Sequence, residues 1–152
     1  MLQELHILFI SMLPIIELRG SIPVAIAIYG FPVWKALLVA VIGNIIPALF
    51  IISLIGKVDE YLSKRSPLWQ RLYSHYITKT RDNHQKKFEL VKEFVLVVLV
   101  AIPLPLTGAW TAALVAYIFG IPMRNAIPLI LLGLIIAGII VVLATAGVSA
   151  IF

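Results

Sequence analysis

Residues 14–23 read PIIELRGSIP, and they place two charges, Glu17 and Arg19, in the middle of an apolar stretch. Proline removes a backbone donor and clashes with the preceding helical turn, while glycine permits the backbone angles that reverse a chain. We therefore predict a helical hairpin here, and not one regular helix. The predicted turn residues are Pro14, Gly20 and Pro23.

The composition around this motif is typical of a membrane protein. Of 152 residues, 62% are apolar and only 12% are charged, whereas a soluble domain has about 25% charged residues. A helix needs roughly 20 apolar residues to cross a bilayer, and three further stretches exceed that length: 36–56, 94–122 and 125–152. We expect one all-helical, multi-pass integral membrane domain in a prokaryotic plasma membrane.

The motif has a counterpart in the second half of the chain, which indicates an internal repeat. Residues 103–112 read PLPLTGAWTA and again combine prolines with a glycine. Each motif is followed by a Gly-x-Pro turn, at 30–32 and at 120–122, and then by a long apolar segment. A second hairpin is therefore predicted. Its turn residues are Pro103, Pro105 and Gly108.

The two arms of each hairpin are too short to cross a bilayer. Each arm is roughly 14 Å long as a helix, against a hydrocarbon core of about 30 Å. We predict re-entrant hairpins at 5–29 and 94–119, followed by spans at 33–56 and 123–152. The alternative is one proline-kinked span in each half.

The segment between the halves, residues 57–93, is basic, with nine basic and five acidic residues. Such a loop beside membrane spans is typical of the cytoplasmic side, and this is favoured over nucleic-acid binding. Residues 68–77 place aromatic and cationic side chains on opposite helical faces, as in a helix lying in the membrane interface; a soluble loop helix is the alternative. With this linker cytoplasmic, the hairpins enter from opposite sides and form an inverted repeat.

Glu17 and Arg19 are the candidate functional site. A charge at the bilayer centre costs at least about 2.5 kcal/mol, so such residues are usually paired, hydrated and functional. Burial would raise the pKa of the Glu17 carboxyl and the arginine would lower it, and the sequence leaves that balance open. Arg19 either partners Glu17 or neutralises an anionic substrate. A structural ion pair that clamps the two hairpins is the alternative.

Other polar residues either complete this site or serve packing. In the second hairpin they are Thr107, Trp110 and Thr111, which line a cavity or pack between helices. Asn44 either satisfies backbone freed by Pro47 or contributes to the site. No histidine has a ligand-spaced partner and there is no cysteine, so we expect no metal and no cofactor. No nucleotide-binding or hydrolase motif occurs, and no enzyme is expected.

The two quoted motifs resemble the small multidrug export protein family, over nearly the whole chain. That family is similar to the wider DedA (VTT-domain) superfamily. The resemblance implies two opposed re-entrant hairpins linked to proton-dependent transport or to lipid flipping, with Glu17 as the acidic residue and Arg19 as its basic companion. The chain lacks the second-hairpin arginine and the extra helices of DedA proteins, and a homodimer would supply the missing walls.

The expected function is secondary transport or export of small or amphipathic molecules, with Glu17 as a proton-coupling carboxylate. The expected partners are membrane lipids, a small-molecule or lipid substrate and a second copy of the chain, but no nucleic acid. One alternative is a lipid flippase or scramblase for a phospholipid or polyprenyl phosphate. The other is a membrane scaffold that transports nothing.

Overall fold

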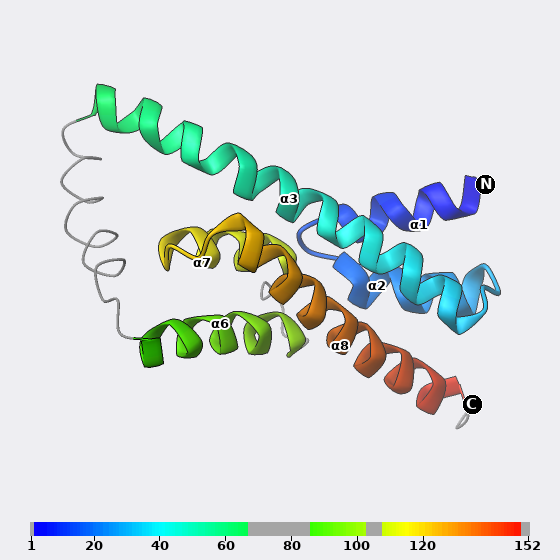
Figure 1. The fold of residues 1–152 in the computed structure, drawn as a ribbon. Helices are drawn as coiled ribbons and strands as arrows, with labels where there is room; N and C mark the ends of the chain where they lie inside the picture. Colours follow the sequence, from blue (N-terminus) through cyan, green and yellow to red (C-terminus); the bar gives the residue numbers. More distant parts are fainter. Residues whose placement is uncertain (1, 67–85, 103–107, 150–152) are drawn as a thin grey trace.

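The computed structural model describes residues 2–66, 86–102 and 108–149, and all regular structure in these ranges is helical. The prediction of an all-helical protein is confirmed. The described part of the chain forms six α-helices and one π-helical segment, η1 (Figure 1). They are α1 Leu2–Met12, α2 Glu17–Pro23, η1 Val24–Ile28, α3 Val33–Arg65, α6 Lys86–Ala101, α7 Ala109–Ile118 and α8 Met123–Ser149.

The short helices form two antiparallel hairpins that point toward each other. The first is α1 followed by α2 and η1, and it starts at the end of the molecule where both termini lie (Figure 1). The second is α6 followed by α7, and it starts at the opposite end. The end of α1, the start of α2, the end of α6 and the start of α7 lie near the middle of the molecule, where segments far apart in the sequence meet.

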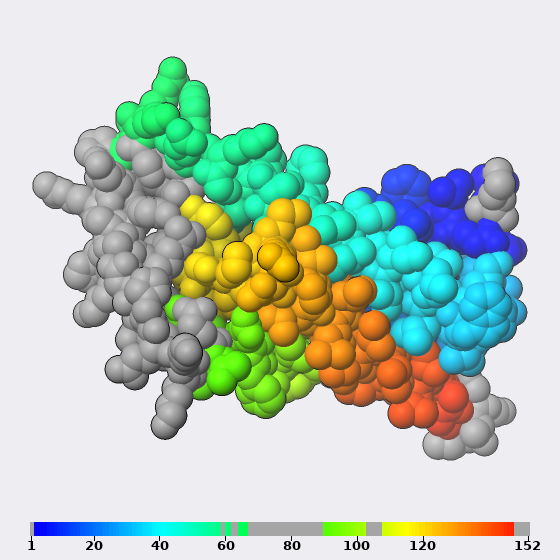
Figure 2. Space-filling view, in the orientation of Figure 1, coloured from blue at the N-terminus to red at the C-terminus, as the bar shows by residue number. Residues whose placement is uncertain are grey.

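The two long helices, α3 and α8, pack against each other and against both hairpins. Each contains a stretch long and apolar enough to cross a membrane, Val33–Val58 and Met123–Gly147. Along its own half of the chain, α1 lies on α3 and α6 lies on α8; across the halves, α2 contacts α8 and α7 contacts α3. Figure 2 shows α7 between the second half of α3 and α6.

Many small side chains lie in the interior and many large apolar side chains lie on the surface, as in a membrane protein. Trp34, Phe50 and Phe94 are about two-thirds exposed, at 67%, 66% and 69%. Small residues let helices approach closely where the surroundings are as apolar as the interior. The buried alanines are Ala25, Ala36, Ala40, Ala48, Ala109, Ala112, Ala113, Ala116, Ala126 and Ala137.

Corresponding glycines set the distance between the first and the long helix of each half. A Cβ on Gly43 of α3 would lie 2.0 Å from the Ser11 Oγ atom of α1, and a Cβ on Gly133 of α8 would lie 2.6 Å from the Val100 Cβ atom of α6. Both distances are too short for a real contact, so each glycine permits a close helix crossing that a side chain would prevent.

Polar contacts also join the same two helix pairs, α1 with α3 and α6 with α8, near the start of each long helix. The Lys35 ammonium donates to the Glu4 carboxylate over 2.6 Å, which joins α3 to α1. The Asn125 amide donates to the Glu93 carboxylate over 3.1 Å, which joins α8 to α6. Each long helix is therefore fixed to its hairpin at two matching places.

The turns before α3 and α8 are also alike, with one difference. Gly30 and Gly120 both adopt a left-handed conformation, with φ of 62° and 69°, which only glycine adopts without strain. The next residue donates its backbone N–H over 2.9 Å, from Phe31 to the Ala25 carbonyl and from Ile121 to the Ala116 carbonyl. The first of these loops is one residue longer, and the π-helical geometry of η1 accommodates that extra residue.

The structure corrects the predicted turn of the first hairpin. The chain reverses at residues 13–16, directly after α1, whereas Gly20 and Pro23 lie within α2. The Gly20 N–H bonds to the Ile16 carbonyl over 3.1 Å, and a Cβ at Gly20 would lie 2.3 Å from the Ile16 Cγ2 atom. Gly20 therefore serves close packing and not chain reversal.

The predicted linker, 57–93, is helical at both ends. Helix α3 continues past residue 56 to Arg65, and α6 begins at Lys86. Hydropathy marks the edge of the apolar stretch, but the helix stops only before Pro67, whose ring disfavours helical geometry in the residue before it. The Lys64 ammonium donates to the Glu60 carboxylate over 2.7 Å and lowers the pKa of Glu60, which supports the last turns.

Four predicted features lie outside the described residues. They are the amphipathic segment 68–77, Pro103, Pro105 and Thr107.

Candidate functional site

Glu17 lies where the two hairpins meet. It is the first residue of α2, directly after the turn at 13–16, and only 3% of it is exposed. Its φ of 51° lies in the left-handed region, which costs a non-glycine residue about 1–2 kcal/mol. The surrounding structure must stabilise this conformation, and such strain is often found at functional sites.

The Glu17 carboxylate forms an ion pair with Arg19. The Arg19 Nη2 and Glu17 Oε2 atoms are 3.6 Å apart, and the side chains are 19% and 4% exposed. Two residues apart on a regular helix would point to nearly opposite faces. Because Glu17 opens the helix in a left-handed conformation, its side chain departs from the regular helical direction and reaches Arg19. We predicted that a non-helical turn would bring the pair together; among residues 13–20, only Glu17 has a positive φ.

The second hairpin contributes a glycine to this place. A Cβ on Gly108 would lie 1.9–2.1 Å from the three carboxyl atoms of Glu17. The carboxylate therefore rests directly on the Gly108 backbone, just before α7 begins. Any side chain at Gly108 would have to displace it.

Trp110 joins the second hairpin to the turn of the first. Its indole N–H donates to the Met12 backbone carbonyl over 3.0 Å. Met12 ends α1, where carbonyl groups have no helical partner. The indole thus satisfies a helix end and fixes α7 beside the turn that leads to Glu17. Thr111, the next residue, is half-buried in α7.

A family comparison decides the identity. The model of a family described as "Putative small multi-drug export protein" matches residues 17–140, which is most of the chain. The chain belongs to the small multidrug export protein family. The matched region begins at Glu17 and includes Gly108, Trp110, all of α3 and residues 123–140 of α8. Neither a curated protein nor a solved structure matches the chain.

Membership in this export family agrees with the two candidate spans and indicates a membrane protein. The family name implies export of small molecules, and this is a transport family and not an enzyme family. Within residues 2–66, 86–102 and 108–149, no three histidine, cysteine or acidic side chains are grouped so that they could hold a metal ion.

Asn44 is fully buried in α3, and the structure argues against one of its two predicted roles. Its side-chain amide makes no hydrogen bond within the part of the chain that the structure describes. It therefore does not satisfy the backbone freed by Pro47. A buried polar group without a partner costs about 1–3 kcal/mol, so a role in binding stays as the interpretation for Asn44.

The sequence analysis missed Ser21. It lies one turn after Glu17 on α2, is fully buried, and its hydroxyl has no hydrogen-bond partner among the described residues. A serine inside the charged motif PIIELRGSIP was the available signal. Serine is common at helix contacts in membranes, so its position alone did not distinguish it.

Proposed function

We propose that the protein is a secondary transporter of small or amphipathic molecules, in which Glu17 is the proton-coupling carboxylate and Arg19 is its partner. One observation carries this proposal: the Glu17 carboxylate is buried against Gly108 at the junction of the two hairpins. It is the only fully buried acidic side chain in the described ranges. Buried ionisable residues in membrane segments commonly lie on proton or substrate pathways.

An inverted repeat with two re-entrant hairpins is the architecture that we propose for this transporter. It is supported by the matching glycine contacts, polar contacts and left-handed turns of the two halves. Helices α1 and α7 have 11 and 10 residues, or about 15 Å, half of a hydrocarbon core. Many transporters place their binding site between broken helices of such repeats.

Proton coupling follows from the geometry of the ion pair. Protonation of Glu17 would cancel its attraction to Arg19, whose Nη2 atom lies 3.6 Å from the carboxylate. A polar or anionic group of a substrate would then replace the Glu17 carboxylate as a partner of Arg19. Binding and proton transfer would thus favour different states of the same hairpin junction, as coupling requires.

A pH gradient across proteoliposomes tests the role of Glu17. We expect Glu17→Gln to abolish gradient-driven transport, because the amide keeps the shape but cannot ionise. Glu4→Gln is the matched control, since Glu4 lies in the same hairpin but at its far end. Transport by Glu17→Gln at the native rate would refute the coupling role. If Glu17→Ala and Arg19→Ala only lowered stability, with no separate loss of transport, the pair would be a structural clamp in a scaffold.

Lipid flipping is the second candidate function. It is favoured by an apolar groove of about 550 Å³ along the second half of α3, which Trp110 borders. Fluorescent-lipid scrambling at the rate of empty liposomes would count against it.

A further inference from the structure

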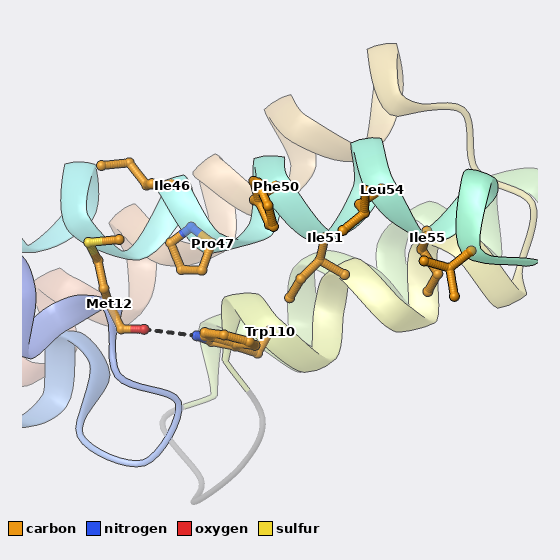
Figure 3. A pocket seen from close by; sticks show the side chains of 9 residues that line it. Met12, Ile46, Pro47, Phe50, Ile51, Leu54, Ile55 and Trp110 are labelled. Atoms are coloured by element: carbon orange, nitrogen blue, oxygen red, sulfur yellow. Dashed lines mark hydrogen bonds between the residues drawn. The ribbon is translucent and has the colours of Figure 1, made fainter.

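The groove along α3 has the shape and lining of a site for a hydrocarbon chain. Nine residues line it, and all are apolar or aromatic (Figure 3). Its volume of about 550 Å³ is within the usual range of ligand sites, about 300–1,000 Å³. From Pro47 to Val58 the groove follows one helix for roughly 16 Å. An elongated apolar groove suits a linear chain better than a compact polar solute.

One end of the groove is closed by a fixed side chain. Figure 3 shows Trp110 beside Met12 and Pro47, at the end nearest the hairpin junction. The hydrogen bond from the indole to the Met12 carbonyl holds the ring in place. The wall formed by Ile51 and Ile55 projects from α3 on the side of α7.

The other end of the groove leads to a cation. Lys57 is exposed, precedes the lining residue Val58 and lies one helical turn after Leu54. Among the residues that the structure describes, no carboxylate forms an ion pair with Lys57, whereas Lys64 is paired with Glu60. Lys57 also begins the basic segment of the chain. An anionic group at the mouth of the groove would therefore meet complementary charge.

We propose that this groove binds one acyl chain of an anionic bilayer phospholipid, with the headgroup at Lys57 and the chain directed toward Trp110. The proposal does not depend on transport, because it requires only the groove, the lysine and a surrounding bilayer. It makes the hairpin junction sensitive to lipid composition, since Trp110 contacts both the groove and the turn before Glu17.

Quenching of Trp110 fluorescence tests the headgroup preference. The chain has three tryptophans, and Trp34→Phe with Trp69→Phe leaves Trp110 alone. In nanodiscs with equal fractions of mid-chain dibrominated lipid, we expect phosphatidylglycerol to quench Trp110 fluorescence several-fold more strongly than phosphatidylcholine. Lys57→Gln should remove this difference, while the matched control Lys64→Gln should retain it. Equal quenching by both lipids would overturn the proposal, because it would indicate unselective contact with bulk lipid.

A second pair of variants tests the position of the chain. Leu54→Phe enlarges an exposed groove residue, whereas Leu38→Phe changes a similarly exposed leucine of α3 outside the groove. We expect Leu54→Phe to lower quenching by both lipids at least twofold and Leu38→Phe to leave it unchanged, with folding checked by circular dichroism. No quenching by either lipid would mean that protein covers the groove, and would also overturn the proposal.

Discussion

At the scale of single residues, the contact between Glu17 and Gly108 is closely constrained. A left-handed backbone, an ion pair and a glycine from the other half of the chain all converge on one carboxylate. The sequence predicted that Glu17 and Arg19 belong together. It could not predict the Gly108 contact, because that contact joins residues far apart in the chain and depends on how the hairpins meet.

We predict that Gly108→Ala destabilises the protein by about 1–3 kcal/mol, the usual cost of overpacking. The φ of Gly108 is −100°, which alanine adopts freely, so the cost would come from the clash with the Glu17 carboxylate. Gly56→Ala is the control, because a Cβ there meets nothing within 4 Å. Thermal unfolding in detergent measures the stability of both variants. A Gly108→Ala protein as stable as the native protein would show that Glu17 does not lie against Gly108.

A smaller effect is expected at Trp110. Trp110→Phe keeps an aromatic ring in the groove but removes the hydrogen bond to the Met12 carbonyl. The loss should be about 0.5–1.5 kcal/mol, plus slower transport if the turn before Glu17 loosens. Trp34→Phe is the matched control, because Trp34 is exposed on the outer surface. Equal unfolding temperatures for the two variants would argue against a structural role of the indole N–H.

At the scale of elements, the two halves make the same contacts with different residues. Proline and glycine landmarks allowed the break near Pro14 and the turns at Gly30 and Gly120 to be predicted. The predicted span ended at residue 56, whereas helix α3 continues to Arg65, because hydropathy marks where the apolar stretch ends and not where helical hydrogen bonding ends. Gly20 was misassigned to the turn because a glycine that permits close packing looks the same in sequence as one that permits reversal.

Gly43→Ala and Gly133→Ala test whether the halves are equivalent. Each added methyl group would separate the first helix from the long helix of its half, so we expect both variants to lose about 1–3 kcal/mol of stability. Gly147→Ala is the control in open space. The unfolding temperatures of the two variants and the control in detergent give the comparison. A loss of stability in only one of the two variants would mean that the two helix crossings are not equivalent.

The π-helical segment makes a separate prediction. Because η1 contains one residue more than the matching part of α7, deletion of the exposed Ala27 should convert it to regular α-helix and leave a folded protein. Deletion of Leu114, which is also exposed, should rotate the following part of α7 and disrupt folding. Size-exclusion chromatography of the two purified variants distinguishes them. Equal aggregation of both would refute the view that η1 absorbs an insertion.

At the scale of the whole molecule, the alanine-rich interior and the large apolar residues on the surface are typical of a helical membrane protein. The short helices pack against α3 and α8. Composition and hydropathy were sufficient to predict a helical membrane protein, but not how its helices pack. The homodimer and the substrate stay predictions, since helix periodicity does not specify what an outer surface contacts.

The central claim is that Glu17 lies between two hairpins that enter the membrane from opposite sides, and cysteine labelling tests it most directly. The chain has no cysteine, so single cysteines can be introduced at Gln3, Ser74 and Ser149. An impermeant thiol reagent is then applied to intact cells. We predict that Gln3 and Ser149 label from outside and that Ser74 does not. Protection of all three in intact cells, with labelling only after lysis, would mean four kinked spans with cytoplasmic termini and would contradict a site between opposed hairpins.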